Sequence, residues 1–279
     1  FFLARGLNYG IDFKGGILIE VRVDDGGKLG AMRQQLSKLN LGEVTLQEFG
    51  APTDILIRIQ KQEGGEKAQQ LAIDKVKREL GSSVEYRRTE FVGPKVSEEL
   101  FYDGVLAVLL AIFGILLYIW FRFEWQFGVG AILALCHDVI TTIGIFALTG
   151  IEFNLSTVAA ILTIAGYSIN DTVVVYDRVR ENLRKYKSLP LNELLNNSVN
   201  ETLSRTVMTS VTTMLALLSL YILGGEVIRG FSFALIWGVL VGTYSSICLA
   251  VPLLLYLNVD RGTNQTQPNS DETLKKGAP

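Results

Sequence analysis

Five apolar segments, each long enough to cross a lipid bilayer, occupy most of this chain after residue 100. They run over 101–121, 127–148, 154–176, 205–223 and 230–257. About 20 apolar residues suffice for a transmembrane helix, and lipid offers no water to backbone N–H and C=O groups, so spanning segments of this length form helices. The sequence therefore predicts a multi-pass α-helical membrane protein over residues 96–257.

Residues 16–95 are more polar, and their pattern is typical of a separate α+β domain. In GILIEVRV, Ile17, Ile19 and Val21 share one face, which is the two-residue period of a half-buried strand. Helices are expected over 25–42 and 65–80, and further strands over 43–49, 54–60 and 82–91, with a turn at 50–53. The order β-α-β-β-α-β is that of a ferredoxin-like fold.

The distribution of basic residues orients the segments. The polar loop expected at 177–204 carries Arg178, Arg180, Arg184, Lys185 and Lys187, whereas TGIEF at 149–153 carries no Lys or Arg. By the positive-inside rule the 177–204 loop is cytoplasmic, which puts the α+β domain outside the cytoplasm and the C-terminal end inside.

An extracytoplasmic domain on the N-terminal side requires a span before it. Residues 1–15 are therefore interpreted as the end of a missing first span and its linker, which raises the expected number of spans to six. Residues 258–279 are polar and contain Pro and Gly, and we interpret them as a disordered cytoplasmic tail. Between domain and bundle, Pro94 ends the last strand and Ser97 is expected to cap the first apolar helix.

Two charged residues inside the apolar segments are the first candidates for function. Asp171 precedes Arg178 by seven residues, or about 10 Å along a helix, and Arg205 begins a segment that enters from the same side. Asp171 and Arg205 can therefore lie at similar depth on antiparallel helices and form an ion pair. Two interpretations stay open: a proton pathway, in which movement of Arg205 changes the proton affinity of Asp171, and a structural pair that fixes helix register.

Other polar residues interrupt the same segments. His137 and Asp138 fall near the middle of the second segment, and both are further candidates for the proton pathway. The alternative for His137 is a packing or capping role, and Asp138 could bond locally to Thr141, Thr142 or His137. In GYSIND, Gly166, Ser168 and Asn170 form a polar interruption, and Gly166 and Ser168 are expected to permit close helix approach.

Several classes of function are disfavoured. The net charge of −2 and the lack of a broad basic patch argue against a nucleic-acid partner. We find no metal-ligand set, no activated nucleophile and no phosphate-binding loop, since IDFKGGI leads into a strand and not a helix. Asp138 and Asp171 are offset in depth, which argues against an intramembrane aspartyl protease. We therefore expect neither an enzyme nor a cofactor, and we interpret Asp177, Arg178 and Arg180 as solvated interfacial charges.

The chain resembles the SecF family, the smaller membrane subunits of the SecDF complex of bacterial protein export. The resemblance rests on GLNYGIDFKGG at 6–16, EFVGPKVSEEL at 90–100, FRFEW at 121–125, ALCHDVITTIGI at 134–145, GYSINDTVVVYDRVREN at 166–182, LSRTVMTSVTT at 203–213 and GFSFALIWGVLVGTYSSI at 230–247. These stretches keep the same order from residue 6 to about residue 257, and their combination is specific.

The resemblance implies a six-span bundle related to the resistance-nodulation-division (RND) exporters, with a periplasmic domain after the first span. It also implies a bacterial cytoplasmic-membrane location, SecD and the SecYEG channel as partners, and a preprotein as substrate on the periplasmic side. Protons would drive the cycle, with Asp171 and Arg205 as the proton-pathway residues of this half. Motion of the bundle would reach the domain through EFVGPK at 90–95.

Two alternative functions stay open. The first is a proton-driven small-molecule exporter of the RND superfamily, for which a domain of about 80 residues is small, because domains of that size enclose little cavity. The second is a non-catalytic scaffold subunit whose polar residues lock its helices to SecD.

Overall fold

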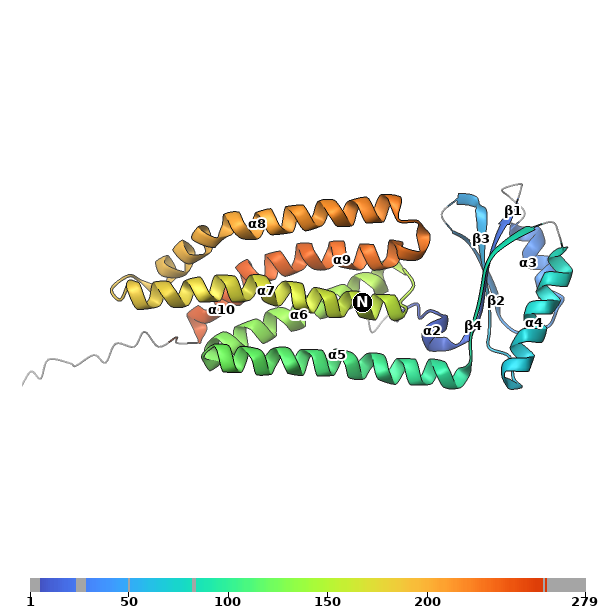
Figure 1. The fold of residues 1–279 in the computed structure, drawn as a ribbon, viewed down its shortest axis with the longest axis horizontal. Coiled ribbons are helices and arrows are strands. Elements are labelled where there is room, and N and C mark those ends of the chain that lie inside the picture. The colour runs from blue at the N-terminus through green and yellow to red at the C-terminus, as the bar shows by residue number, and fades with distance from the viewer. Residues whose placement is uncertain (1–5, 24–28, 50, 82–83, 258, 260–279) are drawn as a thin grey trace, which may run out of the picture.

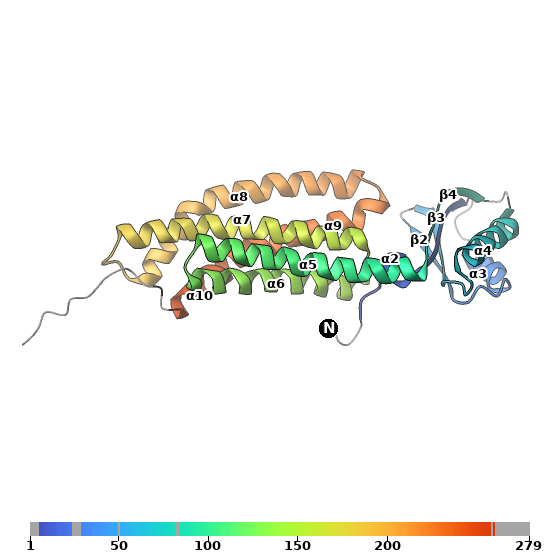
Figure 2. The same cartoon turned by 60° about the horizontal axis from the view of Figure 1, so that its bottom comes forward.

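The computed structural model describes residues 6–23, 29–49, 51–81, 84–257 and 259. Long helices run side by side, and a sheet with two helices lies at one end of them (Figures 1 and 2). The interpretations of residues 1–5 and of most of the C-terminal segment lie outside the described residues.

The α+β domain has the predicted order of elements. Its strands are β1 (Gly16–Val23), β2 (Val44–Phe49), β3 (Ala51–Ile59) and β4 (Val84–Val92), and its helices are α3 (Leu29–Ser37) and α4 (Gly65–Leu80). The strands form one antiparallel sheet in the order β2-β3-β1-β4. This interleaving of two βαβ halves is the ferredoxin-like arrangement.

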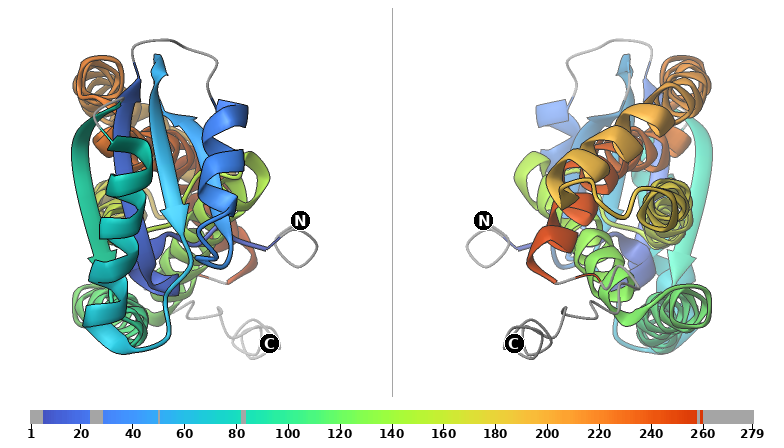
Figure 3. Two further views of the ribbon diagram at one scale, coloured as in Figure 1. Left: turned by 90° about the vertical axis from the view of Figure 1, so that its right-hand side faces the viewer. Right: turned by 90° about the vertical axis from the view of Figure 1, so that its left-hand side faces the viewer.

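The two faces of the sheet pack against different partners. Helices α3 and α4 cover the face away from the bundle (Figure 3, left), where Ile17, Ile19 and Val21 are fully buried with residues of both helices. On the opposite face, Leu18 and Leu56 pack with Ile11 of α2 (Ile11–Lys14), a one-turn helix between sheet and bundle. The alternation of β1 therefore builds two apolar contacts, one within the domain and one toward the bundle.

The turn predicted at 50–53 is shorter in the structure. Strand β3 begins at Ala51, which pairs with Phe49 of β2 after a register shift between Glu48 and Phe49. Pro52 is tolerated there because the pairing of β3 with β1 starts only at Asp54, so its missing N–H breaks no hydrogen bond to β1.

In the described part of the chain, five helical spans form the bundle, as the apolar segments predicted. They are α5 (Pro94–Arg122), α6 (Trp125–Thr149), α7 (Leu155–Lys185), α8 (Leu191–Leu223), and a last span that combines α9 (Glu226–Ser245), the π-helical turn η2 (Ser246–Ala250) and α10 (Val251–Tyr256). Helix α7 is the most buried of the five, while α5 and α8 expose most of their apolar residues.

Two sequence interpretations at helix ends were wrong. The polar stretch 177–204 is mostly helical, because α7 continues to Lys185 and α8 starts at Leu191. These extensions bury Val179, Leu183 and Leu194, so hydropathy marks where the apolar helix surface ends but not where the helix ends. Helix α5 begins at Pro94 after Gly93, and not at Ser97, because proline is favoured in the first helical turn.

Two glycines of α9 allow this helix to approach α7 closely. A Cβ atom at Gly238 would overlap the Ile164 side chain, and one at Gly242 would lie 3.1 Å from Ser168 Cβ. Small residues at such contacts let membrane helices approach closely. Gly166 makes no such contact within the described residues, since a Cβ there would meet none of their atoms within 4 Å, and its role in close helix approach stays a prediction.

Candidate functional site

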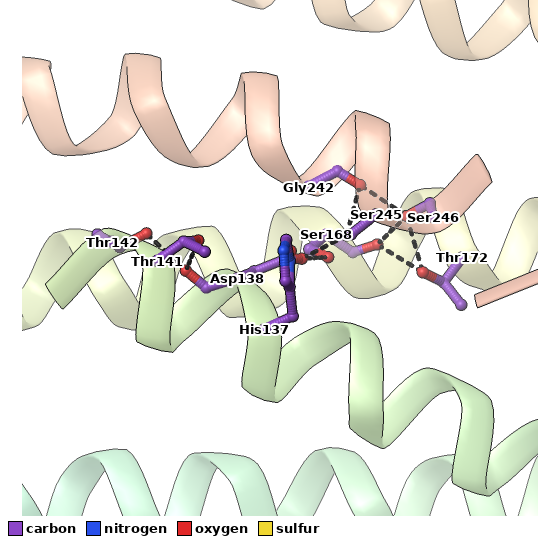
Figure 4. Close-up of polar contacts among 9 residues, drawn as sticks. All are labelled: His137, Asp138, Thr141, Thr142, Ser168, Thr172, Gly242, Ser245 and Ser246. Carbon is purple, nitrogen blue, oxygen red and sulfur yellow. Dashed lines mark hydrogen bonds and ion pairs between the residues drawn. The ribbon is translucent and has the colours of Figure 1, made fainter. Parts of the chain in front are cut away.

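A buried carboxyl group joins three helices at the centre of the bundle. Asp138 of α6 is fully buried, and its Oδ2 accepts hydrogen bonds from Ser168 Oγ of α7 at 2.5 Å and from Ser245 Oγ of α9 at 2.8 Å. His137 Nδ1 lies 3.1 Å from Asp138 Oδ1. Figure 4 shows Ser168 and Ser245 beside the Asp138 carboxyl group. Asp138, Ser168 and Ser245, called here the Asp138 cluster, therefore link α6, α7 and α9 through one side chain.

The hydrogen bonds continue from the Asp138 cluster to the π-helical turn. Ser246, the first residue of η2, lies 2.8 Å from Thr172 Oγ1 and donates to the Gly242 carbonyl oxygen at 2.8 Å. Ser246 and Thr172 are both buried. The polar residues of α7 and of the last span thus meet at the point where the last span departs from α-helical geometry (Figure 4).

The partners of Asp138 differ in part from those considered from sequence. Thr141 and Thr142 donate to its main-chain carbonyl oxygen, at 3.1 and 2.7 Å, and not to its carboxyl group. His137 is a partner, as one alternative proposed. Ser245 was missed, although the adjacent serines of GTYSSI were the available signal in an apolar segment.

Asp171 lies about one helical turn beyond Ser168 and faces the bundle interior. It is 3% exposed, and its Oδ2 is buried without a hydrogen-bond partner among the described residues. An unpaired polar atom in a low-dielectric interior is costly, far more so for a carboxylate than for a carboxylic acid. The Asp171 carboxyl group is therefore a candidate for a change in protonation or in hydrogen-bond partner.

The expected ion pair between Asp171 and Arg205 is not formed in this conformation. No ion pair within 4.0 Å joins them in the part of the chain that the structure describes. Thr202 and Thr206 of α8 are buried, whereas Arg205 is exposed. Spacing along the sequence predicts the depth of Arg205 but not its direction around the helix, and a single residue changes that direction by about 100°.

The three residues of the GYSIND interruption have different surroundings. Ser168 is 2% exposed and bonds to Asp138. Gly166 and Asn170 are exposed on the outer face of α7, on the same side as Ala159 and Thr163. The outer stripe of α7, defined as Ala159, Thr163, Gly166 and Asn170, is thus small and polar although it belongs to a membrane-spanning helix.

The charges at the far end of α7 are paired and not merely solvated as expected. Arg178 contacts Glu201 of α8 at 2.5 Å and Glu181 at 2.7 Å, and Asp177 pairs with Arg122 of α5 at 2.8 Å. These contacts fasten α7 to both neighbours. The described residues contain no group of three or more His, Cys, Asp or Glu side chains able to hold a metal ion.

Comparison with known proteins identifies the family. The model for "Protein export membrane protein SecD/SecF, C-terminal" matches residues 72–260, and the "SecD/SecF GG Motif" model matches residues 1–26. The protein translocase subunit SecF of Rhodobacter capsulatus is 48% identical over 291 residues, covering 99% of this chain and 87% of the relative. The chain belongs to the SecF family of protein translocase subunits.

Further members of the SecF family and a solved structure agree. SecF of Rickettsia rickettsii is 50% identical over 253 residues, covering 88% of this chain and 81% of the relative. A crystal structure of SecDF, a translocon-associated membrane protein from Thermus thermophilus, matches with a TM-score of 0.82 and 41% identity over 91% of this chain. The chain spans 35% of the length of that SecDF chain.

Proposed function

We propose that this SecF-family chain couples the proton gradient of the bacterial cytoplasmic membrane to movement of its periplasmic domain, and so assists SecYEG-dependent protein translocation. The observation that carries the proposal is the pair of buried carboxyl groups, Asp138 and Asp171, in the interior of a membrane bundle. Ionisable residues at such positions are expensive and mark ion or proton pathways.

Asp171 is the proton carrier in this proposal. In the conformation described, its unpaired Oδ2 is better tolerated as part of a protonated carboxyl group than as a carboxylate. A proton from the periplasmic side adds to the carboxylate, and it leaves to the cytoplasmic side when Arg205 turns inward and pairs with the carboxylate that remains. Moving one charge through 100 mV supplies about 2.3 kcal/mol, enough to shift a two-state packing of α7 and α8.

Asp138 and His137 have a supporting role in the proposal. The carboxyl group of Asp138 already accepts from Ser168 and Ser245, with His137 in contact. This bonding holds α6 and α9 to α7, so a displacement of α7 is passed to both neighbours.

The partners follow from family membership and from the surface of the bundle. The outer stripe of α7 is suited to close helix–helix contact, because small and polar residues favour such contact in membranes. We propose that SecD covers this stripe, that the assembly acts beside SecYEG on a preprotein at the periplasmic side, and that lipid surrounds the remaining apolar surface. The basic residues at the far ends of α5 and α7 support a cytoplasmic position for those ends.

A gradient-dependent export assay in inverted vesicles, with the partner SecD present, tests the proton role. We expect Asp171→Asn to assemble normally and to lose the gradient-dependent part of export. Asp177→Asn is the matched control, because it changes a carboxylate of the same helix that is 41% exposed and paired with Arg122. Near-normal export by a well-folded Asp171→Asn variant would contradict the proton role of Asp171 and favour the scaffold alternative.

A further inference from the structure

The domain and the bundle are joined at a second place besides the peptide link from β4 to α5. The loop between α6 and α7 forms main-chain hydrogen bonds with the segment before α2: Gly10 N donates to Phe153 O at 2.9 Å, and Phe153 N donates to Asn8 O at 2.8 Å. Tyr9 pairs with Phe153 as an isolated parallel β-bridge. The loop just before α7 is thus attached to the chain that enters the sheet.

Asp12 extends this attachment to helix α7 itself. Its Oδ2 accepts a hydrogen bond from Leu155 N, the first residue of α7, at 2.8 Å. Helix α2, which carries Asp12, leads through Gly15 directly into β1. A displacement of α7 along its axis therefore acts on β1 across a single hydrogen bond and a few residues.

One ion pair crosses from the loop to the middle of the sheet. Arg58 of β3 donates from Nη2 to Oε2 of Glu152 in the α6–α7 loop, and their side chains are only 22% and 26% exposed. The Glu152 side chain also lies close to the chain before α2, because a Cβ atom at Gly10 would lie 2.6 Å from Glu152 Oε1. Among the described residues, this is the ion pair that joins the sheet to the bundle.

The surroundings of the pair are incompletely packed. A hollow of about 240 Å³ on one side is lined in part by Leu18, Leu56 and Glu152, and another of about 460 Å³ is lined in part by Tyr9 and Arg58. Apolar packing alone therefore leaves room for the sheet to tilt on the bundle. An ion pair that lies between the two hollows is well placed to fix one orientation of the sheet relative to the bundle.

We expect the pair to contribute little to net stability. Burial raises the pKa of the Glu152 carboxyl above its usual value although Arg58 opposes the shift, and Asp12 raises it further. Desolvation thus outweighs the attraction to Arg58, as is common for buried ion pairs, which often specify geometry more than they stabilise.

We propose that Arg58 and Glu152 are positioning residues that fix the orientation of the periplasmic domain on the bundle, so that movement of α7 turns the sheet directly. The proposal deepens the proposed function and rests on it for its purpose. The positioning itself is independent of any proton gradient and can be measured without one.

The test uses the full chain with Cys136 and Cys248, both free thiols, replaced by serine. Spin labels at Lys67→Cys on α4 and at Ile222→Cys near the end of α8 report the distance between domain and bundle, and both positions are exposed. We expect a narrow distance distribution in the parent protein. Glu152→Gln and Arg58→Gln should each broaden it at least about two-fold, because domains joined by small interfaces move relative to one another by default.

The charge-swapped double variant Arg58→Glu/Glu152→Arg should restore much of the narrow distribution. The control is Arg22→Gln, which removes an ion pair to Asp54 within the sheet, since neither residue lines either of the two hollows. Thermal stability of Glu152→Gln should not fall below that of the parent, which separates loss of orientation from loss of folding.

Unchanged distributions in both single variants would overturn the proposal, and so would a swapped variant as broad as either of them. Failure of the proton role in the export assay would leave a positive distance result standing, so the two proposals fail separately.

Discussion

Replacing Ser245 by alanine removes one of the two hydroxyl donors to Asp138 Oδ2 among the described residues, together with a longer contact of the same hydroxyl to the Gly242 carbonyl oxygen at 3.1 Å. Ser245 is fully buried, and its Oγ lies 2.8 Å from Asp138 Oδ2. Alanine differs from serine by one oxygen atom, so the substitution leaves only a very small cavity. The expected loss of stability is therefore essentially the loss of this hydrogen bond.

Two magnitudes bracket that loss. Hydrogen bonds between helices in a membrane bundle contribute about 0.6 kcal/mol on average and up to about 1.7 kcal/mol, whereas bonds to charged groups in soluble proteins contribute about 1.5–3 kcal/mol. Because Asp138 is fully buried and would keep, among the described residues, only Ser168 as a donor to Oδ2, we expect Ser245→Ala to lower the free energy of unfolding by about 1–2 kcal/mol, near the upper end of the membrane range.

The assay is unfolding in mixed micelles, with Ser219→Ala as the matched control. Ser219 is an exposed serine of α8 whose hydroxyl donates to the Leu215 carbonyl of its own helix, so its removal should cost far less. In an Asp138→Ala background the effect of Ser245→Ala should shrink, because Asp138→Ala already removes the acceptor of this bond. A Ser245→Ala variant as stable as the Ser219→Ala control would refute the account of the Asp138 cluster.

Two further outcomes test packing and charge elsewhere. Gly238→Ala should cost about 1–3 kcal/mol of unfolding free energy in the same micelle assay, because the new Cβ overlaps Ile164, while Gly166→Ala should cost nothing; equal effects would contradict the packing of α7 on α9. In the domain, hydrogen bonds from Arg22 hold the pKa of Asp54 below its usual value. The stability from this pair is present above the ordinary Asp pKa of about 3.9 and is lost as pH falls through the lower folded-state pKa. The difference in thermal stability between wild type and Arg22→Gln should therefore shrink at acid pH, and a constant difference would contradict the assignment.

Two sequence patterns predicted most elements of this fold: the alternation of apolar and polar residues in the strands, and the length of the apolar segments in the bundle. The alternation in GILIEVRV requires a sheet with one face under helices, and α3 and α4 cover that face. Apolar length predicted the five spans. Helix ends were less predictable, because the helical extensions around Asn182 and Ser198 are stabilised by contacts between α7 and α8, and a hydropathy profile does not contain such contacts.

The sequence predicted how deep the site residues lie in the bundle, but not which neighbouring helix each of them faces. Asp171 and Asp138 stood out as carboxyl groups in apolar segments, and both are buried. The position of Arg205 on the exposed face of α8 depends on how α8 is rotated against α7, which spacing does not fix. Ser245 lies 107 residues from Asp138, and only the packing of α9 on α6 brings them together.

The π-helical turn at Ser246–Ala250 determines toward which side the residues of α10 point. A π turn takes up one residue more than an α turn, so Val251 and Leu254 of α10 stand one position later than an uninterrupted helix would place them. Both side chains are buried, which means that this extra residue is required for their packing. Conversion of the turn to α-helix would rotate α10 by about 100° relative to α9. The rotational setting of the last part of this span relative to α9 is therefore determined by one extra residue in a single turn.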